Sequence, residues 1–374
     1  MQNTALYIHW PFCASKCPYC DFNSHVTESI DHTIWRESYV ATLHYYAELL
    51  PDRQITSIYF GGGTPSLMHP DTVQAIIDET QKLWHIDNNI EITLEANPTS
   101  VEINKFTAFR IAGVNRVSLG IQALNDKDLK FLGRQHSVDE ALKALDIAQT
   151  TFDRASFDLI YARPQQTLAE WEAELHHAAK LAQGHLSLYQ LTIERNTPFY
   201  MAHAKGEFTL PKDTLAADFY TLTQDILTAA GLPAYEVSNH AMDGHESRHN
   251  LSYWRYEDYI GIGPGAHGRL TLNGQKHATR EHSAPQIWLD KTTANGHAHH
   301  PFESLTEREQ SLERLMMGLR TTEGIRTESI QNTLNQDKFK TALAENWLTQ
   351  TDTTLKATTT GILRLNALLD FIIN

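Results

Sequence analysis

Cys13-Ala-Ser-Lys-Cys17-Pro-Tyr-Cys20 contains all three cysteines of the 374-residue chain. Spacings of three and two residues between the thiols let one loop wrap three corners of an iron–sulfur cube. Electron-transfer clusters commonly use four cysteine thiolates, and this chain has no fourth cysteine. The pattern therefore predicts a [4Fe–4S] cluster with one iron open to a small chelating molecule. S-adenosylmethionine (SAM) can chelate in this way through its amino and carboxylate groups.

Two other interpretations of the cysteines stay open from spacing alone. The thiols could be buried core residues, although three of them in one loop beside Lys16 and Pro18 fit a core poorly. They could also bind zinc with His9 or His25 as the fourth ligand, since Cys₃His sites are common. Iron analysis and visible absorbance would separate a cluster from zinc.

Around this loop, short β-branched runs alternate with amphipathic segments of helical length, which is typical of a parallel α/β domain. The predicted strands are Leu6–His9, Ile55–Phe60, Glu91–Glu95, Arg116–Gly120, Ala155–Ile160 and His185–Leu191. The predicted helices between them are Thr33–Leu50, Pro70–Trp84, Val101–Ala112, Ser137–Thr150 and Leu168–Leu181. Six βα units predict an incomplete (β/α)6 barrel, two units short of the full eight, with a lateral opening for a large substrate.

The pattern changes after Glu194, where a helix over Asp213–Ala230 and a loop-rich stretch follow. The segment 271–303 is polar and rich in His and Thr, which predicts a linker. The last unit has predicted helices at Glu307–Arg320 and Lys338–Gln350, then strand-like runs at Thr353–Ala357 and Gly361–Leu369. We therefore expect a partial-barrel domain over 1–270 that holds the cluster and SAM, the linker, and a small winged-helix-like α+β domain over 304–374.

Composition excludes several partners and locations. The formal net charge is -14, and the last unit carries eight basic against nine acidic residues from position 304 onward, so nucleic acid is not an expected partner. No apolar run approaches the roughly 20 residues of a membrane helix, and no secretory signal precedes the first strand. The expected location is cytoplasmic. Three cysteines in a reducing compartment exclude a disulfide framework.

Polar and glycine residues follow several predicted strands at the edge where α/β barrels build their sites. Gly61-Gly-Gly-Thr-Pro65 follows the second strand, and glycines there allow a ligand close to the backbone. Glu95 ends the third strand, Gln122 follows the fourth, Asp158 lies in the fifth, and Arg134 lies between the last two. Each alone is more often structural. Together they predict one mouth that could bind an amino acid and a ribose.

Longer motifs around these residues closely resemble the radical SAM branch that contains anaerobic coproporphyrinogen III dehydrogenase. They are Tyr7-Ile-His-Trp-Pro-Phe-Cys13, the cysteine loop, Gly61–Pro65, Glu95-Ala-Asn-Pro98, Ala112-Gly-Val-Asn-Arg-Val-Ser-Leu-Gly-Ile-Gln122 and Leu132-Gly-Arg134. The resemblance implies cluster ligation by Cys13, Cys17 and Cys20. Around SAM it implies Tyr7, Tyr19, Gly62, Gly63, Thr64, Glu95, Gln122, Arg134 and Asp158. Arg134 would pair with the SAM carboxylate, and Asp158 and Glu95 would serve its ribose and amino ends.

One turn departs from the family pattern. After the fifth strand the family usually has Gly-Leu-Pro-Gly-Gln-Thr, whereas this chain has Ala162-Arg-Pro-Gln-Gln-Thr167. The loss of two glycines calls the shape of that turn into question. Asp158 is retained, so the implied SAM site is not affected.

Two features separate the members of the branch. The dehydrogenase typically has a further cysteine two residues past the loop and a substantial N-terminal extension. This chain has Phe22 at that position and reaches Cys13 almost at once. Both departures resemble the HemW family of heme chaperones instead. That family's HNxxYW motif is present as His249-Asn-Leu-Ser-Tyr-Trp254, and its glycine-rich segment as Tyr259-Ile-Gly-Ile-Gly-Pro-Gly-Ala-His267.

The second resemblance implies that the chain binds heme and delivers it to acceptor proteins such as respiratory enzymes. His249 is the leading candidate for heme contact, because imidazole is a common axial ligand and Tyr253 and Trp254 could stack on a porphyrin. A capping or core histidine is the plainer alternative among 20 histidines. Implied partners also include an electron donor such as a flavodoxin or ferredoxin, and peripheral membrane contact through the acceptors. The alternative function is oxidative decarboxylation of coproporphyrinogen III in porphyrin biosynthesis.

Overall fold

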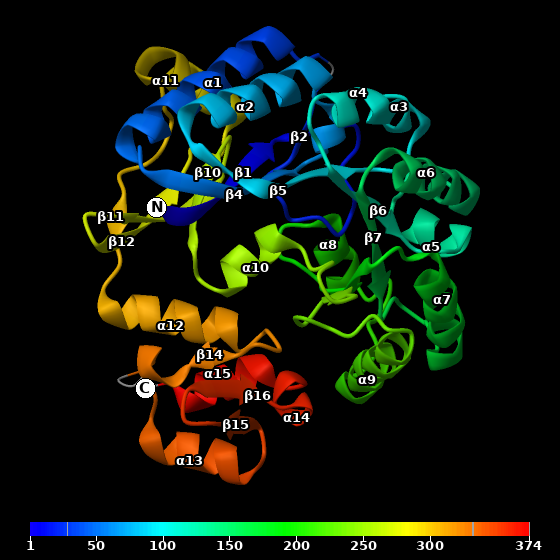
Figure 1. The fold of residues 1–374 in the computed structure, drawn as a ribbon. Helices are drawn as coiled ribbons and strands as arrows, with labels where there is room; N and C mark the ends of the chain where they lie inside the picture. The colour runs from blue at the N-terminus through cyan, green and yellow to red at the C-terminus, as the bar shows by residue number, and fades with distance from the viewer. Residues whose placement is uncertain (28, 331–332, 374) are drawn as a thin grey trace.

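Six parallel strands form the centre of the largest sheet in the computed structural model, which describes residues 1–27, 29–330 and 333–373 (Figure 1). These strands are β1 (Gln2–Trp10), β4 (Arg53–Gly62), β5 (His85–Ala96), β6 (Arg116–Gln122), β7 (Arg154–Tyr161) and β8 (His185–Gln190). They lie side by side in chain order, each parallel to the next. All six strands predicted from the alternating pattern are confirmed, with ends that differ by a few residues.

Helices between these strands cover the outer face of the sheet (Figure 1). They are α1 (His32–Leu49), α2 (Pro70–Leu83), α3 (Ser100–Ile103), α4 (Phe106–Ile111), α5 (Asp126–Phe131), α6 (Val138–Thr151) and α7 (Leu168–Leu181). Helices α6 and α7 each begin with a capping box. In these, the side chains of Ser137 and Glu140, and those of Thr167 and Glu170, each accept a hydrogen bond from the other residue's backbone N–H. The single helix predicted over Val101–Ala112 is two short helices, α3 and α4. At the break, Lys105 donates to carbonyl groups of residues 66–68.

The sheet has further strands beyond β1 at one edge and beyond β8 at the other, and it does not close into a full barrel. Strand β10 (Asp258–Ile262) adds parallel to β1, followed by antiparallel β11 (His267–Leu272), β12 (Gln275–Arg280) and β13 (Glu303–Ser304). Strand β9 (Asn239–Ala241) pairs with β8 at the other edge. The two edge strands, β13 and β9, do not pair with each other within the described chain. The incomplete barrel predicted from six βα units is confirmed, with additional strands at both edges.

The segment 271–303, for which composition predicts a linker, is structured and belongs to the barrel. It holds the end of β11, all of β12 and helix α11 (Pro285–Asn295). Trp288 on α11 is fully buried and stacks on Trp35 of α1, with ring centroids 5.5 Å apart. Edge strands with one solvated face carry many polar residues, so composition alone resembles that of a linker.

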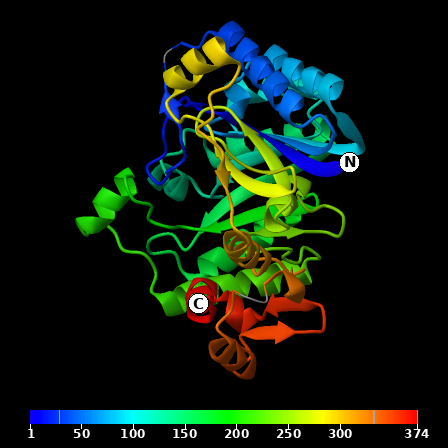
Figure 2. The same cartoon turned by 90° about the vertical axis from the view of Figure 1, so that its left-hand side faces the viewer.

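The last residues form a separate small domain below the barrel, on the side away from α1 and α2 (Figures 1 and 2). Its helices are α12 (Glu307–Gly318), α13 (Gln336–Ala344), α14 (Thr359–Ile362) and α15 (Leu365–Ile372), and its three-stranded sheet has the order β14 (Ile325–Arg326), β16 (Thr354–Ala357), β15 (Leu348–Gln350). Its own hydrophobic core includes Leu315, Phe339 and Leu369. The run Gly361–Leu369, predicted as a strand, is helical instead.

Between the two domains lies α10 (Arg248–Trp254), which contacts β1, β4 and β10 on one side and α12 on the other. Helices α8 (Pro198–Ala204) and α9 (Asp213–Ala229) complete the barrel domain. The ion pairs Arg255–Glu323 and Arg269–Glu313 join the barrel to the C-terminal domain. Within the described residues, none of the helices combines the length and hydropathy needed to span a bilayer.

The turn after β7 keeps a glycine-like backbone without the glycines. Ala162 and Gln165 have positive φ angles of 56° and 63°, at the two positions where the related pattern has Gly. The turn is held by Arg163, whose buried side chain pairs with Asp128 of α5 and Glu174 of α7. These ion pairs fix the turn that follows β7 despite the left-handed residues.

Gln165→Gly is expected to raise the free energy of unfolding by about 0.5–1 kcal/mol. Relief of the left-handed strain exceeds the added entropy of the unfolded chain, and the exposed Gln165 side chain loses little packing. Denaturant unfolding monitored by circular dichroism measures the change. The matched control is Ala173→Gly on the exposed face of α7, which should lower stability by about 1 kcal/mol. Equal losses in both variants would contradict the strain interpretation.

Candidate cluster and cofactor site

The three cysteines lie on one surface loop whose ends are fastened to the barrel. Strands β2 (Phe12–Cys13) and β3 (His25–Val26) pair in parallel and close the loop at its base. Asn23 donates from Nδ2 to the carbonyl oxygens of Pro264 (2.8 Å) and Ser283 (2.9 Å). All three cysteines are free and half-buried. The loop therefore presents its thiols while its base is held by two short strands and by backbone carbonyl groups far away in sequence.

The glycine turn after β4 packs against the strand that leads into the cysteine loop. Gly63 N–H donates to the Trp10 carbonyl (2.7 Å), and Thr64 N–H donates to the Phe12 carbonyl (2.8 Å). A Cβ atom on Gly63 would lie 2.6 Å from the Phe12 oxygen, so only glycine allows this approach. The N–H groups of the turn are thus used inside the protein, and its glycines serve close packing beside the cysteine loop.

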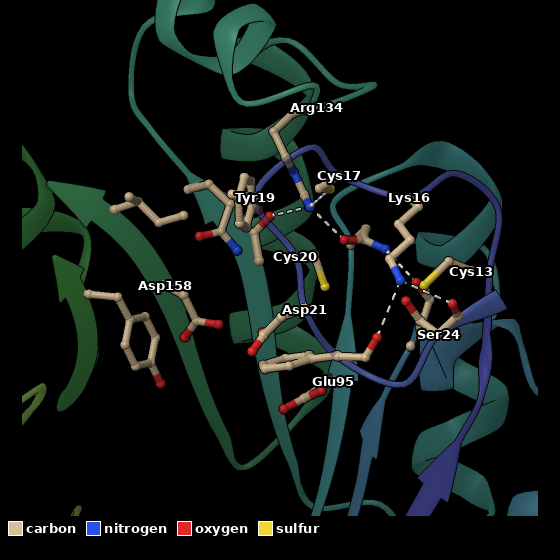
Figure 3. Close-up of a pocket in the computed structure, with 18 of the residues that line it drawn as sticks. Cys13, Lys16, Cys17, Tyr19, Cys20, Asp21, Ser24, Glu95, Arg134 and Asp158 are labelled. Atoms are coloured by element: carbon tan, nitrogen blue, oxygen red, sulfur yellow. Dashed lines mark hydrogen bonds between the residues drawn. The ribbon is translucent and has the colours of Figure 1, made fainter. Parts of the chain in front are cut away.

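A cavity of about 480 Å³ lies between the cysteine loop and the carboxyl ends of the parallel strands. Eleven of the thirteen residues predicted for the site line it: Cys13, Cys17, Tyr19, Cys20, Gly62, Gly63, Thr64, Glu95, Gln122, Arg134 and Asp158. Figure 3 shows the labelled side chains of Glu95 and Asp158 reaching into this space opposite the cysteines and Arg134. The predicted mouth and the cysteine loop therefore form one pocket.

Two partly buried carboxyl groups form the inner wall of the cavity. Burial raises the pKa of Glu95 to about 7, although hydrogen bonds from the Tyr59 hydroxyl (2.7 Å) and the Gly62 N–H (3.3 Å) oppose the shift. Burial also raises the pKa of Asp158 to about 6, opposed by its hydrogen bonds from serine side chains. A raised pKa means that the donors and positive charge around a carboxyl do not fully compensate for its burial. An ammonium group and ribose hydroxyls would supply both, so this wall fits the implied ligand.

Arg134 brings a cation to the same cavity, next to the cysteine loop. Its Nη1 donates to Cys17 Sγ (3.3 Å), and its Nη2 donates to Asn97 Oδ1 (2.5 Å) and to the Gly120 carbonyl (2.7 Å). Its Nε is buried without a hydrogen-bond partner. A buried donor without a partner costs about 1–3 kcal/mol, so a ligand that accepts from it is favoured. The geometry fits the carboxylate partner that the resemblance implies.

The arrangement of these donor side chains does not match the geometry of a single-metal site. Among the described residues, no three His, Cys, Asp or Glu side chains converge closely enough to hold one ion. The histidines considered for zinc are engaged elsewhere, since His9 bonds to Tyr7 Oη (3.0 Å) and to the Asn23 carbonyl (2.9 Å), and His25 to Asn23 Oδ1 (3.3 Å). A four-iron cluster takes each thiol at a different corner, so its ligands stand farther apart. The loop fits a cluster better than zinc.

Tyr7 and His249, the other two predicted site residues, do not line the cavity. His249 is 1% exposed, and both ring nitrogens are bonded, Nδ1 to Ser57 Oγ (2.8 Å) and Nε2 to Tyr253 Oη (2.7 Å). Burial lowers its pKa to about 3, so the ring is neutral at pH 7. Neither nitrogen is free for heme iron, and the prediction of axial ligation by His249 does not fit this geometry. Tyr7 bonds to His9 beneath the pocket.

Several cavity residues were not among the sequence-derived candidates, and three of them are Asn97, Ser118 and Tyr189. Asn97 accepts from Arg134 and donates to Thr64 Oγ1 (3.2 Å), and Ser118 donates to Asp158 (3.2 Å). Tyr189, near the end of β8, also lines the cavity and is 42% exposed. The signal for all three was their place at or near the carboxyl ends of the predicted strands, where each second residue shares one face.

Comparisons with known proteins identify the family of this chain. The chain matches the Radical SAM superfamily over residues 7–178 and the HemN C-terminal domain over residues 305–364. The solved structure of coproporphyrinogen III oxidase (HemN) from Escherichia coli has the same fold, with a TM-score of 0.80 over 99% of this chain and 89% of that one, at 20% identity. The chain is thus a radical SAM protein, and the cofactors of that superfamily are a [4Fe–4S] cluster and SAM.

Relatives that align with this chain over most of their own length define the place of the chain within the radical SAM class. Heme chaperone HemW of Escherichia coli K12 is 36% identical over 98% of this chain and 97% of its own. A mitochondrial radical S-adenosyl methionine domain-containing protein 1 of Bos taurus is 40% identical over 87% of this chain and 74% of its own. The chain belongs to the HemW family, as its motifs indicate.

Proposed function

We propose that this chain binds heme and transfers it to acceptor proteins, with a [4Fe–4S] cluster and SAM held in the pocket between the cysteine loop and the barrel. The observation that carries the proposal is the near full-length relation to heme chaperone HemW of Escherichia coli K12. The same pocket brings together three thiols, Arg134 and two partly buried carboxyl groups. The acceptors, the flavodoxin or ferredoxin donor and the membrane contact stay predictions.

Each part of the pocket has a separate task in this proposal. When bound, the cluster supplies an electron source, and the sulfonium of SAM is the group such an electron can cleave. Cys13, Cys17 and Cys20 would hold the cluster. Arg134 would orient the SAM carboxylate. Glu95, kept partly ionised by the Tyr59 hydroxyl, would receive the amino group, and Asp158 would bind the ribose hydroxyls.

The alternative function is the decarboxylation performed by coproporphyrinogen III dehydrogenase. The structural likeness to HemN at 20% identity establishes the fold alone. Phe22 stands where the dehydrogenase typically has a further cysteine, and its side chain is 59% exposed at the cavity. A phenyl ring cannot replace a thiol as a metal ligand or a redox group. This difference favours the chaperone over the dehydrogenase.

One set of assays on anaerobically reconstituted protein tests the proposal. Heme titration should give saturable binding, and heme should then move to an apo-heme protein such as apomyoglobin. With SAM, a reductant and coproporphyrinogen III, we expect no doubly decarboxylated product. Product formed over many turnovers would establish the dehydrogenase instead. A protein that takes up no heme would contradict the chaperone function.

A further inference from the structure

Helix α10 packs against β1, β4 and β10 and is tied to the barrel by one buried carboxylate. Glu91 Oε2 accepts from the Arg248 N–H (3.3 Å) and Glu91 Oε1 from the His249 N–H (3.2 Å). Arg154 of β7 bonds to the same carboxylate at 2.9 Å. Because Glu91 is only 4% exposed, this anchor is shielded from water. The position of His249 is therefore set by strands β5 and β7 of the barrel.

His249 in turn contacts the residue that supports the pocket carboxyl. Its ring stacks on Tyr59, with centroids 4.9 Å apart and planes inclined by 24°. Tyr59 donates its hydroxyl to Glu95 Oε1 at 2.7 Å. Ser57, two residues earlier on the same face of β4, bonds to the other edge of the imidazole. The contacts run without interruption from α10 to the wall of the cavity.

We propose that His249 is a positioning residue of the SAM site, holding the Tyr59 ring so that its hydroxyl stays on Glu95. The inference rests on the proposed function, because it takes Glu95 as the receptor for the amino group of SAM. It gives the HNxxYW motif a role that needs no contact between His249 and heme. The neutral imidazole suits this role, since one ring nitrogen donates, the other accepts, and no buried charge is introduced.

The hydrogen bond from Tyr59 affects how Glu95 ionises. That bond lowers the pKa of Glu95 against the larger effect of burial, so its loss would raise the pKa above 7. Binding of an ammonium group needs the ionised carboxylate and is lost as the pH falls through that pKa. The charged or titratable groups that face Glu95 are Tyr7, Tyr59, Arg116, Asp158, Tyr189 and Tyr253. Of these, only Arg116 is cationic, and a displaced Tyr59 would leave its effect unchanged.

The test compares SAM and heme binding by reconstituted His249→Ala with the wild type. We expect the dissociation constant for SAM to rise about 10-fold, the loss of one well-placed hydrogen bond to a charged group. The pH midpoint of SAM binding should move upward by about half to one unit. His249→Phe keeps the stacked ring and should stay within about 3-fold of wild type. Heme affinity should be unchanged. Equilibrium dialysis with labelled SAM and absorbance titration with heme measure both.

Two further variants make the outcome decisive. Tyr59→Phe should weaken SAM binding in the same way, and adding His249→Ala to it should cost less than about a further 2-fold, because both act through one hydroxyl. His240→Ala, a buried histidine that bonds to Gln224, controls for general destabilisation and should bind SAM normally. A wild type that binds no SAM would refute the proposed function. A wild type that binds SAM and a His249→Ala variant that binds it equally, or loses heme instead, would refute the inference alone.

Discussion

Cys17→Ala is expected to remove the [4Fe–4S] cluster completely, together with its brown colour. With three cysteines in the chain, each variant leaves two thiols, and no other cysteine can take the vacant corner. Thiolate ligation is what holds such a cluster. Anaerobic reconstitution followed by iron and sulfide analysis and visible absorbance should give near-zero iron, and Cys13→Ala and Cys20→Ala should behave alike.

Ser15→Ala is the matched control, since Ser15 is exposed on the same loop between two of the cysteines. It should retain about four irons per chain and the wild-type spectrum. Four irons in all three cysteine variants would show that the cluster is held elsewhere. A colourless wild type that binds zinc stoichiometrically would bring back the Cys₃His interpretation.

Arg134→Met should cause the second large effect, a loss of SAM affinity by about 100-fold or more. Removing one partner of a buried charge pair typically costs 2–5 kcal/mol, and Met replaces the volume of Arg without its donors. The change also leaves Asn97 Oδ1 and the Gly120 carbonyl without that donor, so stability should fall by about 1–3 kcal/mol. Labelled SAM in equilibrium dialysis gives the affinity, and thermal unfolding gives the stability.

Arg110→Met controls for the loss of an arginine, because Arg110 forms an exposed ion pair with Asp153 on the outer surface. Such pairs contribute about 0–1 kcal/mol, and SAM binding should be unaffected. Arg134→Lys keeps the positive charge but loses the planar guanidinium group. Its affinity for SAM should therefore lie between that of the wild type and that of Arg134→Met. Wild-type SAM affinity in Arg134→Met would exclude Arg134 as the carboxylate partner.

The residues of the pocket could be predicted because they depend on local spacing and on one rule of sheet topology. The cysteines lie within one loop, so their spacing alone brings them together. Glu95 and Asp158 are far apart in sequence, but parallel strands place their carboxyl ends at one edge. The directions of Tyr7 and His249 could not be predicted, because a motif gives a position in the chain and not the neighbours that a side chain meets after folding.

The structure of the segment 271–303 and of the C-terminal end was beyond the reach of composition. The buried Trp288 packs α11 against α1, and a single apolar residue hardly changes the average polarity of the segment. In the final run, Leu365, Leu368, Leu369 and Ile372 are buried together, which is the spacing of a helix face. The apolar density of that run favoured a strand, whereas its period indicated a helix.

The fastening of the cysteine loop has a consequence for how the mature protein is assembled. The barrel core contains no cysteine, and the loop is closed at its base by two-residue strands and by Asn23. We therefore expect the barrel to fold without iron, unlike small metalloproteins in which metal binding is itself the folding step. On that expectation, iron–sulfur delivery machinery would meet a folded client, and a lost cluster could be replaced without unfolding the chain.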